Sequence, residues 1–323
     1  MKAFLKRIVP VAGDPPREWI RKIAFFAALL VFIGSAGYLV NDLVLQPGRT
    51  RSVNSEMREL YRAETPDEPE AETDDTVYPD GMDEAFRSLY RRNSDVRGWL
   101  TFATTGNSDL FEGAIDNPVV QTTDNEYYLN HDFLKDVNKA GTLYFDYRND
   151  LSATGENRNT IVYGHNLNSG LMFSRLNLLA SGNVSCAKRL TTLTLDTLYE
   201  QNTYKVFAVL IVDADPGEAF NYLRTDFADN EEFEWFIEEV RRRSLYDFGD
   251  VEVNEGDELL TLSTCSNKRE THLSNGRTVV VARKLRAGES AAVNTAKTVR
   301  NEDVLMPRQW YVAQDKELPK EYR

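Results

Sequence analysis

The chain has little of what several classes of protein need. Its 323 residues include only two cysteines and three histidines. Two cysteines are too few for a disulfide-dense scaffold, and the scattered cysteines and histidines have no zinc-ligand spacing. Neither glycine-rich phosphate-binding pattern, G-x-x-x-x-G-K-[ST] or G-x-G-x-x-G, occurs, and there are no internal repeats. The sequence therefore predicts no metal and no other cofactor.

Basic charge is also scarce after the first 22 residues. The formal net charge is −13, and residues 1–22 alone carry +4, so the remaining chain carries −17. Nucleic-acid binding requires clustered Lys and Arg, and no basic stripe follows the N-terminal segment. The sequence therefore predicts an acidic main domain that does not bind nucleic acid.

One long apolar run is present near the N-terminus. Ile23–Val40 has no charged residue, and as a helix it would be about 27 Å long, close to the thickness of a bilayer core. We expect residues 23–45 to form a membrane anchor, with residues 1–22 in the cytoplasm by the positive-inside rule and the rest of the chain outside. A cleaved signal peptide and a buried core helix are the alternatives.

The segment after the anchor differs in composition from the rest. Glu64–Pro79 is acidic, contains proline and has almost nothing to bury, as expected for a solvated spacer. We therefore divide the extracellular part into a linker over residues 46–81, a catalytic domain over residues 82–286 and a C-terminal tail over residues 287–323.

Short β-type runs separated by Gly, Asn and Asp dominate the central region and predict an all-β barrel or sandwich. There are eight such runs: Trp99–Phe102, Pro118–Gln121, Thr142–Tyr147, Thr160–Tyr163, Leu190–Leu195, Tyr204–Val212, Leu259–Thr264 and Thr278–Leu285. Residues 82–92 have helical spacing. Asn230–Arg243 has one apolar stripe, an acidic first turn and a basic last turn, so we expect an amphipathic helix inserted between two strands.

Three residues at strand ends have the side chains that acyl transfer needs. Cys265 ends one predicted strand, His165 ends another after Gly164, and Arg277 opens the strand that follows Cys265. A thiol can act as nucleophile, an imidazole can protonate a leaving amine, and a guanidinium can stabilise an oxyanion. By position alone, Cys265 could instead be a buried structural cysteine and Arg277 a surface arginine.

Several motifs resemble those of the sortases. Thr261–Cys265 reads T-L-S-T-C, an arginine opens the next strand, and Tyr163–Asn166 reads Y-G-H-N. Three further strings resemble class B sortases specifically: Asn117–Gln121, Tyr127–Asp132 and Phe145–Asp150. The predicted helix before the cysteine-bearing strand also resembles that class. The resemblance covers about residues 82–286, with the motifs in the family's order.

The resemblance implies a mainly β fold, an eight-stranded sortase barrel with peripheral helices on an N-terminal transmembrane helix. It makes Cys265 the nucleophile, His165 the general acid and base, and Arg277 the clamp for the oxyanion or the substrate. Arg269 and Arg283 are alternatives to Arg277. The resemblance also suggests weaker candidates for lining the substrate groove: Asn130, Tyr163, Ser263 and Thr264.

The implied function is transpeptidation at the membrane surface of a Gram-positive cell. The thiol would cleave a C-terminal sorting motif of the N-P-x-T-N or [NS]-P-x-T-[GN] kind after Thr. The surface protein would then pass to an amine, on a peptidoglycan precursor or a pilin lysine. A hydrolytic cysteine protease and a non-catalytic membrane-tethered scaffold remain the alternatives.

The other histidines and the second cysteine are not expected to take part in catalysis. We interpret His131 as structural and His272 as a solvated loop residue. Cys186 is expected to be a free, partly buried thiol, because a disulfide with Cys265 would disable the nucleophile.

Overall fold

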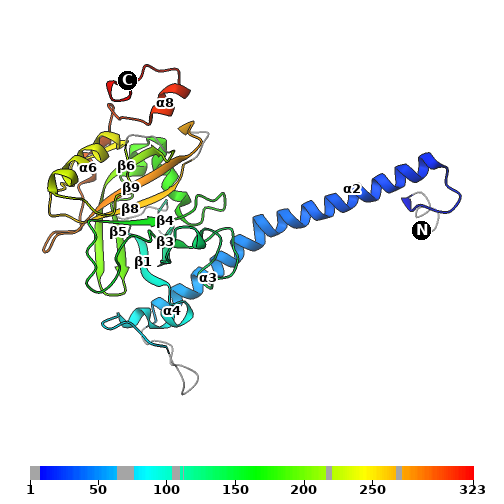
Figure 1. Ribbon diagram of the computed structural model, residues 1–323, viewed down its shortest axis with the longest axis horizontal. Coiled ribbons are helices and arrows are strands. Elements are labelled where there is room, and N and C mark those ends of the chain that lie inside the picture. Colours follow the sequence, from blue (N-terminus) through cyan, green and yellow to red (C-terminus); the bar gives the residue numbers. More distant parts are fainter. Residues whose placement is uncertain (1–7, 64–75, 104–109, 112, 216–219, 267–270) are drawn as a thin grey trace. The chain divides into compact units, whose positions relative to one another are not determined.

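The computed structural model describes residues 8–63, 76–103, 110–111, 113–215, 220–266 and 271–323 (Figure 1). The chain divides into two compact units, one ending at Arg49 and the other covering Thr50–Arg323.

The N-terminal unit is helical. Helix α2 (Pro16–Val40) begins with a proline in its first turn and continues through one π-helical turn, η1 (Asn41–Leu45), into α3 (Gln46–Tyr61). The predicted anchor, residues 23–45, falls within α2 and η1. Within the described ranges, this continuous helix is the one long and apolar enough to cross a membrane by length and composition.

The second unit contains a closed eight-stranded barrel with the strand order β1-β2-β3-β4-β8-β9-β6-β5. The barrel predicted from the sequence is confirmed, and the alternative of a two-sheet sandwich is wrong. Its strands are β1 (Val96–Ala103), β2 (Asp116–Val120), β3 (Leu143–Phe145), β4 (Asn159–Tyr163), β5 (Thr192–Thr197), β6 (Gln201–Asp213), β8 (Leu259–Cys265) and β9 (Gly276–Lys284).

Strand β8 is buried on both faces of the barrel wall. Leu260 and Leu262 point into the main core, whereas Leu259 joins a second cluster on the outer face. Because side chains alternate along a strand, Ser263 and Cys265 lie on the same outward face of β8 as Leu259.

Helix α6 (Asn230–Arg243) covers the outer face of β6, as Figure 1 shows. Its bounds agree with the prediction. The Asp229 carboxylate accepts a hydrogen bond from the backbone N–H of Glu232 and so caps the first turn. Phe233, Phe236 and Val240 are buried on the barrel, and each contributes about 1.5–3 kcal/mol by leaving water.

From Thr50 onward, α3 belongs to the barrel unit and packs against it. The Tyr61 ring stacks on Trp99 with 4.4 Å between ring centroids, and its hydroxyl donates to Asp196. Arg58 forms an ion pair with the buried carboxylate of Asp116. Residues 50–61 of the predicted linker therefore pack on the barrel, and residues 64–75 of that linker lie outside the described residues.

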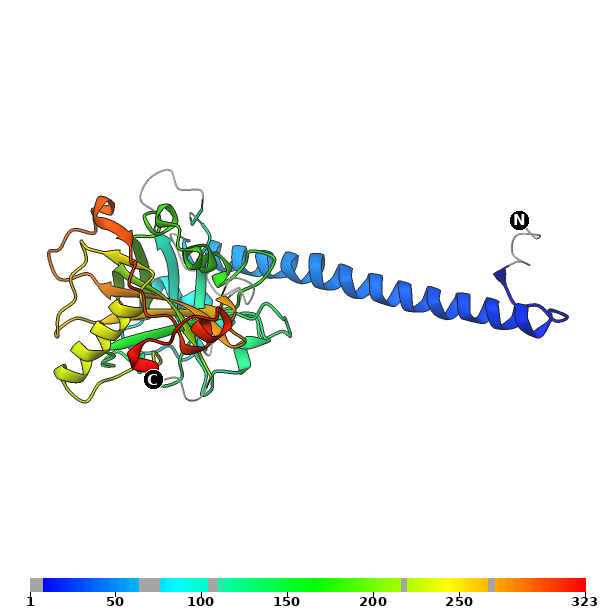
Figure 2. The same ribbon diagram turned by 90° about the horizontal axis from the view of Figure 1, so that it is seen from above.

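The other elements in the described part of the unit are short. These are η2 (Glu84–Phe86), α4 (Arg87–Arg92), η3 (Tyr127–Leu129), η4 (Phe173–Ser181), α5 (Val184–Ala187), β7 (Tyr246–Phe248), η5 (Thr295–Lys297), β10 (Thr298–Arg300), α8 (Arg308–Ala313) and η6 (Lys320–Tyr322). The C-terminal tail wraps the domain: β10 pairs with β7, and Glu321 forms an ion pair with Arg242 of α6, close to which the tail lies in Figure 2.

Candidate active site

Cys265 is the last residue of β8, and its side chain is exposed. It lies on the same outward face as Ser263, two residues earlier, because side chains alternate along the strand. Thr264 lies on the opposite face, towards the barrel interior, and is 2% exposed. The structure therefore brings Ser263 but not Thr264 to the face that carries the thiol.

Arg277 is the direct partner of Cys265 in the antiparallel pair β8–β9. Its guanidinium donates from Nη1 to the carbonyls of Asn275 (3.2 Å) and Gly276 (3.1 Å), and the side chain is half-buried. Arg283 lies at the far end of β9, buried in an ion pair with Glu289, so the register favours Arg277 over this alternative. Arg269 lies outside the described residues.

His165 reaches the same end of the barrel through β4, which runs parallel to β8. Tyr163 is the register partner of Ser263, and the backbone N–H of Gly164 donates to the Ser263 carbonyl. A Cβ on Gly164 would lie 2.5 Å from Leu143 Cδ2, so no side chain fits before the histidine. The three predicted catalytic residues therefore come from three adjacent strand ends.

The imidazole of His165 is held by one backbone carbonyl. Its Nε2 lies 2.8 Å from the oxygen of Leu129, at the end of η3. A carbonyl oxygen only accepts hydrogen bonds, so Nε2 carries a proton, and Nδ1 is the nitrogen left for proton exchange.

Two tyrosines lie within electrostatic reach of both the thiol and the guanidinium. Burial raises the pKa of Tyr144, with Cys265 acting in the same direction and Arg277 against it. Burial also raises the pKa of Tyr222, although its bond to Ser263 and the charge of Arg277 oppose this. Both hydroxyls therefore stay protonated at neutral pH.

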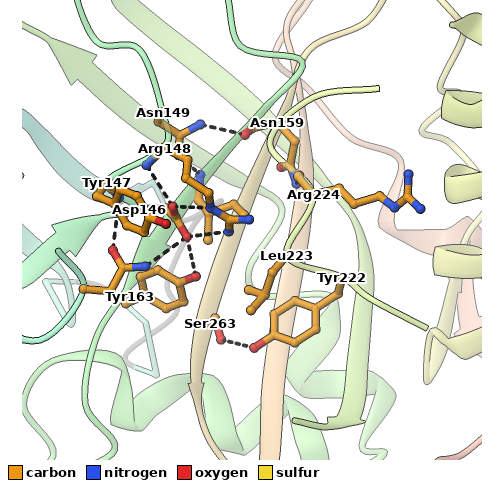
Figure 3. A network of polar contacts seen from close by, with 12 residues as sticks. Asp146, Tyr147, Arg148, Asn149, Asn159, Tyr163, Tyr222, Leu223, Arg224 and Ser263 are labelled. Carbon is orange, nitrogen blue, oxygen red and sulfur yellow. Dashed lines mark hydrogen bonds and ion pairs between the residues drawn. The ribbon is translucent and has the colours of Figure 1, made fainter. Parts of the chain in front are cut away.

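Tyr222 reaches the site from the segment between β6 and α6. Its hydroxyl lies 3.0 Å from Ser263 Oγ, and Figure 3 shows the ring turned towards that serine. Asn159 holds this segment over the barrel, because its side chain donates to the Arg224 carbonyl at 2.7 Å and its backbone N–H donates to Thr225. Sequence reasoning missed Tyr222, which lies in an irregular segment without a motif.

Asn177 of η4 is a second residue that sequence reasoning missed. Its Nδ2 donates to the Cys265 carbonyl (3.2 Å), and its Oδ1 accepts from the Thr278 hydroxyl (2.8 Å). One amide therefore links the end of β8 to the start of β9, beside both Cys265 and Arg277. No local pattern marks it, since the contact depends on how η4 folds onto the barrel.

The remaining predicted residues lie around this centre. Asn130 is exposed at the end of η3, directly after Leu129. The His131 ring stacks on the Tyr127 ring, and its Nδ1 forms a hydrogen bond with the backbone carbonyl of Tyr127. These contacts fit a structural role. His272 is exposed, and Cys186 is a half-buried free thiol.

The chain resembles known proteins over most of its barrel unit. The sortase domain family matches residues 113–285. Sortase B of Listeria monocytogenes is 33% identical over 196 residues, which cover 60% of this chain and 71% of the relative. The structure of sortase B from Bacillus anthracis in complex with AAEK1 is similar with a TM-score of 0.59 at 30% identity, covering 75% of this chain and 99% of that one. A Staphylococcus aureus sortase B–substrate complex is similar with a TM-score of 0.60 at 26% identity. That match covers 76% of this chain and 100% of the other.

These matches, together with the barrel and its strand-end thiol, identify the class of protein: the chain belongs to the sortase family. Within that family it is a class B sortase, a cysteine transpeptidase. The family match ends at residue 285, so the tail from residue 287 lies outside it.

Proposed function

We propose that this sortase cleaves a C-terminal sorting motif after Thr and transfers the surface protein to an amine, using Cys265, His165 and Arg277. The observation that carries the proposal is the pairing of Cys265 with Arg277 across β8–β9, next to the parallel strand that ends before His165. Acyl transfer needs a nucleophile, an acid and an oxyanion clamp at one place, and the adjacent strand ends support assigning these roles to Cys265, His165 and Arg277.

The first step forms an acyl-enzyme. The Cys265 thiolate attacks the Thr carbonyl carbon, and Arg277 stabilises the negative charge that develops on the carbonyl oxygen. The C–N bond then breaks, Nδ1 of His165 gives its proton to the leaving amine, and a C–S thioester bond remains.

The second step releases the product. An incoming amine attacks the thioester, His165 takes its proton, and the C–S bond breaks as the new C–N bond forms. A peptidoglycan precursor is the acceptor we propose, and a pilin lysine would use the same chemistry. Water as the acceptor would make the protein a hydrolytic cysteine protease.

The outer face beside Cys265 is the proposed substrate groove. Tyr163 and Ser263 are register partners on this face, and exposed Asn130 adjoins the carbonyl that holds His165. A sorting motif of the N-P-x-T-N or [NS]-P-x-T-[GN] kind would lie along them. A Staphylococcus aureus sortase B–substrate complex has a similar fold. We assign Thr264 to packing, because it is buried on the other face.

We also propose the topology predicted from the sequence. Residues 1–22 are cytoplasmic, 23–45 span the membrane once, and the barrel lies outside the cell. The linker of residues 46–81 then begins with a helix that packs on the barrel, which supports a catalytic unit that starts near Thr50 rather than residue 82.

The test is product analysis with the full chain in detergent micelles. Peptides with each motif are incubated with an oligoglycine amine, a lysine-bearing pilin peptide or no amine. An amide product with oligoglycine supports wall anchoring, and a lysine product supports pilus assembly. Hydrolysis at the same rate with and without amine supports the protease.

A further inference from the structure

Asp146, directly after β3, is a buried charged residue that the proposed chemistry does not use. Its side chain is 0% exposed, and Arg148 pairs with both carboxylate oxygens, at 2.8 Å from Nε and 2.7 Å from Nη2. Burial by itself would raise the pKa of Asp146, but the hydrogen bonds from Arg148 and Tyr163 outweigh it and hold the pKa below its ordinary value. Asp146 is therefore a fixed anion behind the site.

The same carboxylate binds two further segments. The Tyr163 hydroxyl donates to Oδ2 at 2.7 Å, and Figure 3 shows Tyr163 and Arg148 both turned towards Asp146. The side-chain amide of Asn125 donates from Nδ2 to Oδ2 of Asp146 at 3.2 Å, and its Oδ1 accepts from the backbone N–H of Tyr147.

These two segments are the ones that meet at His165. Tyr163 ends β4 and precedes the imidazole by two residues. Asn125 lies two residues before η3, which presents the Leu129 carbonyl to Nε2 of His165. The donor and the acceptor of the bond that orients the imidazole therefore lie on two chain segments tied to one carboxylate.

We propose that Asp146 is a positioning residue: it holds β4 and η3 together so that the Leu129 carbonyl fixes the imidazole of His165. This deepens the proposed function and rests on it, because it concerns the same histidine. Charged hydrogen bonds are strong and directional, so one buried anion can fix both segments.

The main test variant is Asp146→Asn, which keeps the shape of the side chain and removes its charge. Arg148 is 38% exposed, so losing its partner does not leave a buried unpaired cation, and the variant is expected to fold. Asp257→Asn is a matched control. Asp257 is 6% exposed and pairs through both carboxylate oxygens with Arg286, which is 38% exposed, as Arg148 is. Asp257 lies two residues before β8 begins, at the end of the strand opposite Cys265.

Two readouts are used, both on the full chain in detergent micelles. The first is the ¹⁵N-histidine spectrum, which contains only three residues and is assigned with a His165→Asn variant. It reports the hydrogen-bonded Nε2 proton without any substrate. The second is steady-state kinetics with a sorting peptide and an amine, which gives kcat and KM separately.

We expect Asp146→Asn to speed exchange of the His165 Nε2 proton and to lower kcat by up to about 10²-fold, with little change in KM. Asp257→Asn should leave both unchanged. Asn125→Ala and Tyr163→Phe, which keep the Asp146–Arg148 pair, should change the His165 signal in the same direction by less. They provide the answer if Asp146→Asn does not fold.

An unchanged His165 signal and kcat in Asp146→Asn, or equal changes in Asp146→Asn and Asp257→Asn, would overturn the proposal. If no peptide is turned over by the wild type, the proposed function fails. The histidine spectra still decide whether Asp146 orients the imidazole.

Discussion

Cys265 and Arg277 are direct partners across β8 and β9, although they are twelve positions apart in the sequence. The continuous pairing of the two strands, from Leu259 with Arg283 to Cys265 with Arg277, sets this relationship. The placement of the arginine relative to the thiol therefore depends on the register of the sheet and not on the connecting loop.

Replacing Arg277 should impair the chemistry more than substrate binding. We expect Arg277→Ala to lower kcat by about 10²–10³-fold, the usual loss for one oxyanion donor. Arg277→Lys should recover only part of the rate, because lysine lacks the planar fork of donors. Steady-state kinetics with a sorting peptide measures both. Arg283→Met is the control: it should reduce stability yet leave the kcat of the folded protein unchanged, and a large loss of kcat there would shift the role to Arg283.

The Asn177 bridge should matter through the geometry of the two strand ends. We expect Asn177→Ala to lower kcat by up to about 30-fold, since two neutral hydrogen bonds of about 1 kcal/mol each are lost and about 1.4 kcal/mol is tenfold in rate. Thr278→Val removes one of the two and should have a smaller effect. The double variant, measured in the same assay, should be less impaired than the product of the two single effects. Fully independent effects would mean that the bridge does not act as a unit.

Much of the fold could be predicted because its signals are local. The eight strands follow β-type runs, and Asn230–Arg243 has a capping aspartate before it and a complete apolar stripe. The sequence could not decide between barrel and sandwich, because closure depends on long-range pairs such as β1 with β5. It also missed that α3 packs on the barrel, since its buried residues are few and set among polar ones.

The candidate site also contains residues that the sequence could predict and residues that it could not. The predicted residues stand at strand ends or in motifs, where sequence position indicates spatial position. Asn177 and Tyr222 come from irregular or 3₁₀ segments, and their contacts arise only when those segments fold onto the barrel. Thr264 was predicted to line the groove with its neighbour, but alternation along β8 turns it inward.

A catalytic fragment that begins at residue 82 should be less stable than one that begins at residue 50. Val53 and Met57 are buried in the same cluster as Trp99, and Tyr61 covers that indole. Their loss should cost about 3 kcal/mol or more, because each buried side chain contributes about 1.5–3 kcal/mol. Calorimetry of fragments 50–323 and 82–323 compares their Tm values. Equal Tm values would support residue 82 as the start of the folded unit.

Acid should weaken the fold partly through Glu289. Hydrogen bonds from Arg283 and Lys205 hold the pKa of Glu289 below its ordinary value. Since the folded pKa lies below the unfolded value of about 4.3, this carboxylate stabilises the fold above that pH and loses its contribution as the pH falls through the folded pKa. Glu289→Gln should cost about 3 kcal/mol at pH 7, because Arg283 and Lys205 are buried and lose their partner.

Urea unfolding of fragment 50–323 between pH 3 and 7 measures the free energy of unfolding for the wild type and the variant. The variant should show a shallower decline in acid. Glu302→Gln is the control, because its carboxylate is exposed and 4.0 Å from Arg300, and it should behave as the wild type. Parallel pH curves for the wild type and Glu289→Gln would contradict the assignment.

The central claim is that Cys265 carries the acyl group, and intact-protein mass spectrometry tests it most directly. The full chain is mixed with a sorting peptide in the absence of amine, quenched in acid and digested to locate the adduct. The account predicts a thioester on Cys265 that ends in the Thr of the motif, is discharged by added amine, and persists in Cys186→Ala but not in Cys265→Ala. Turnover of the peptide by Cys265→Ala, or an adduct on Cys186, would contradict it.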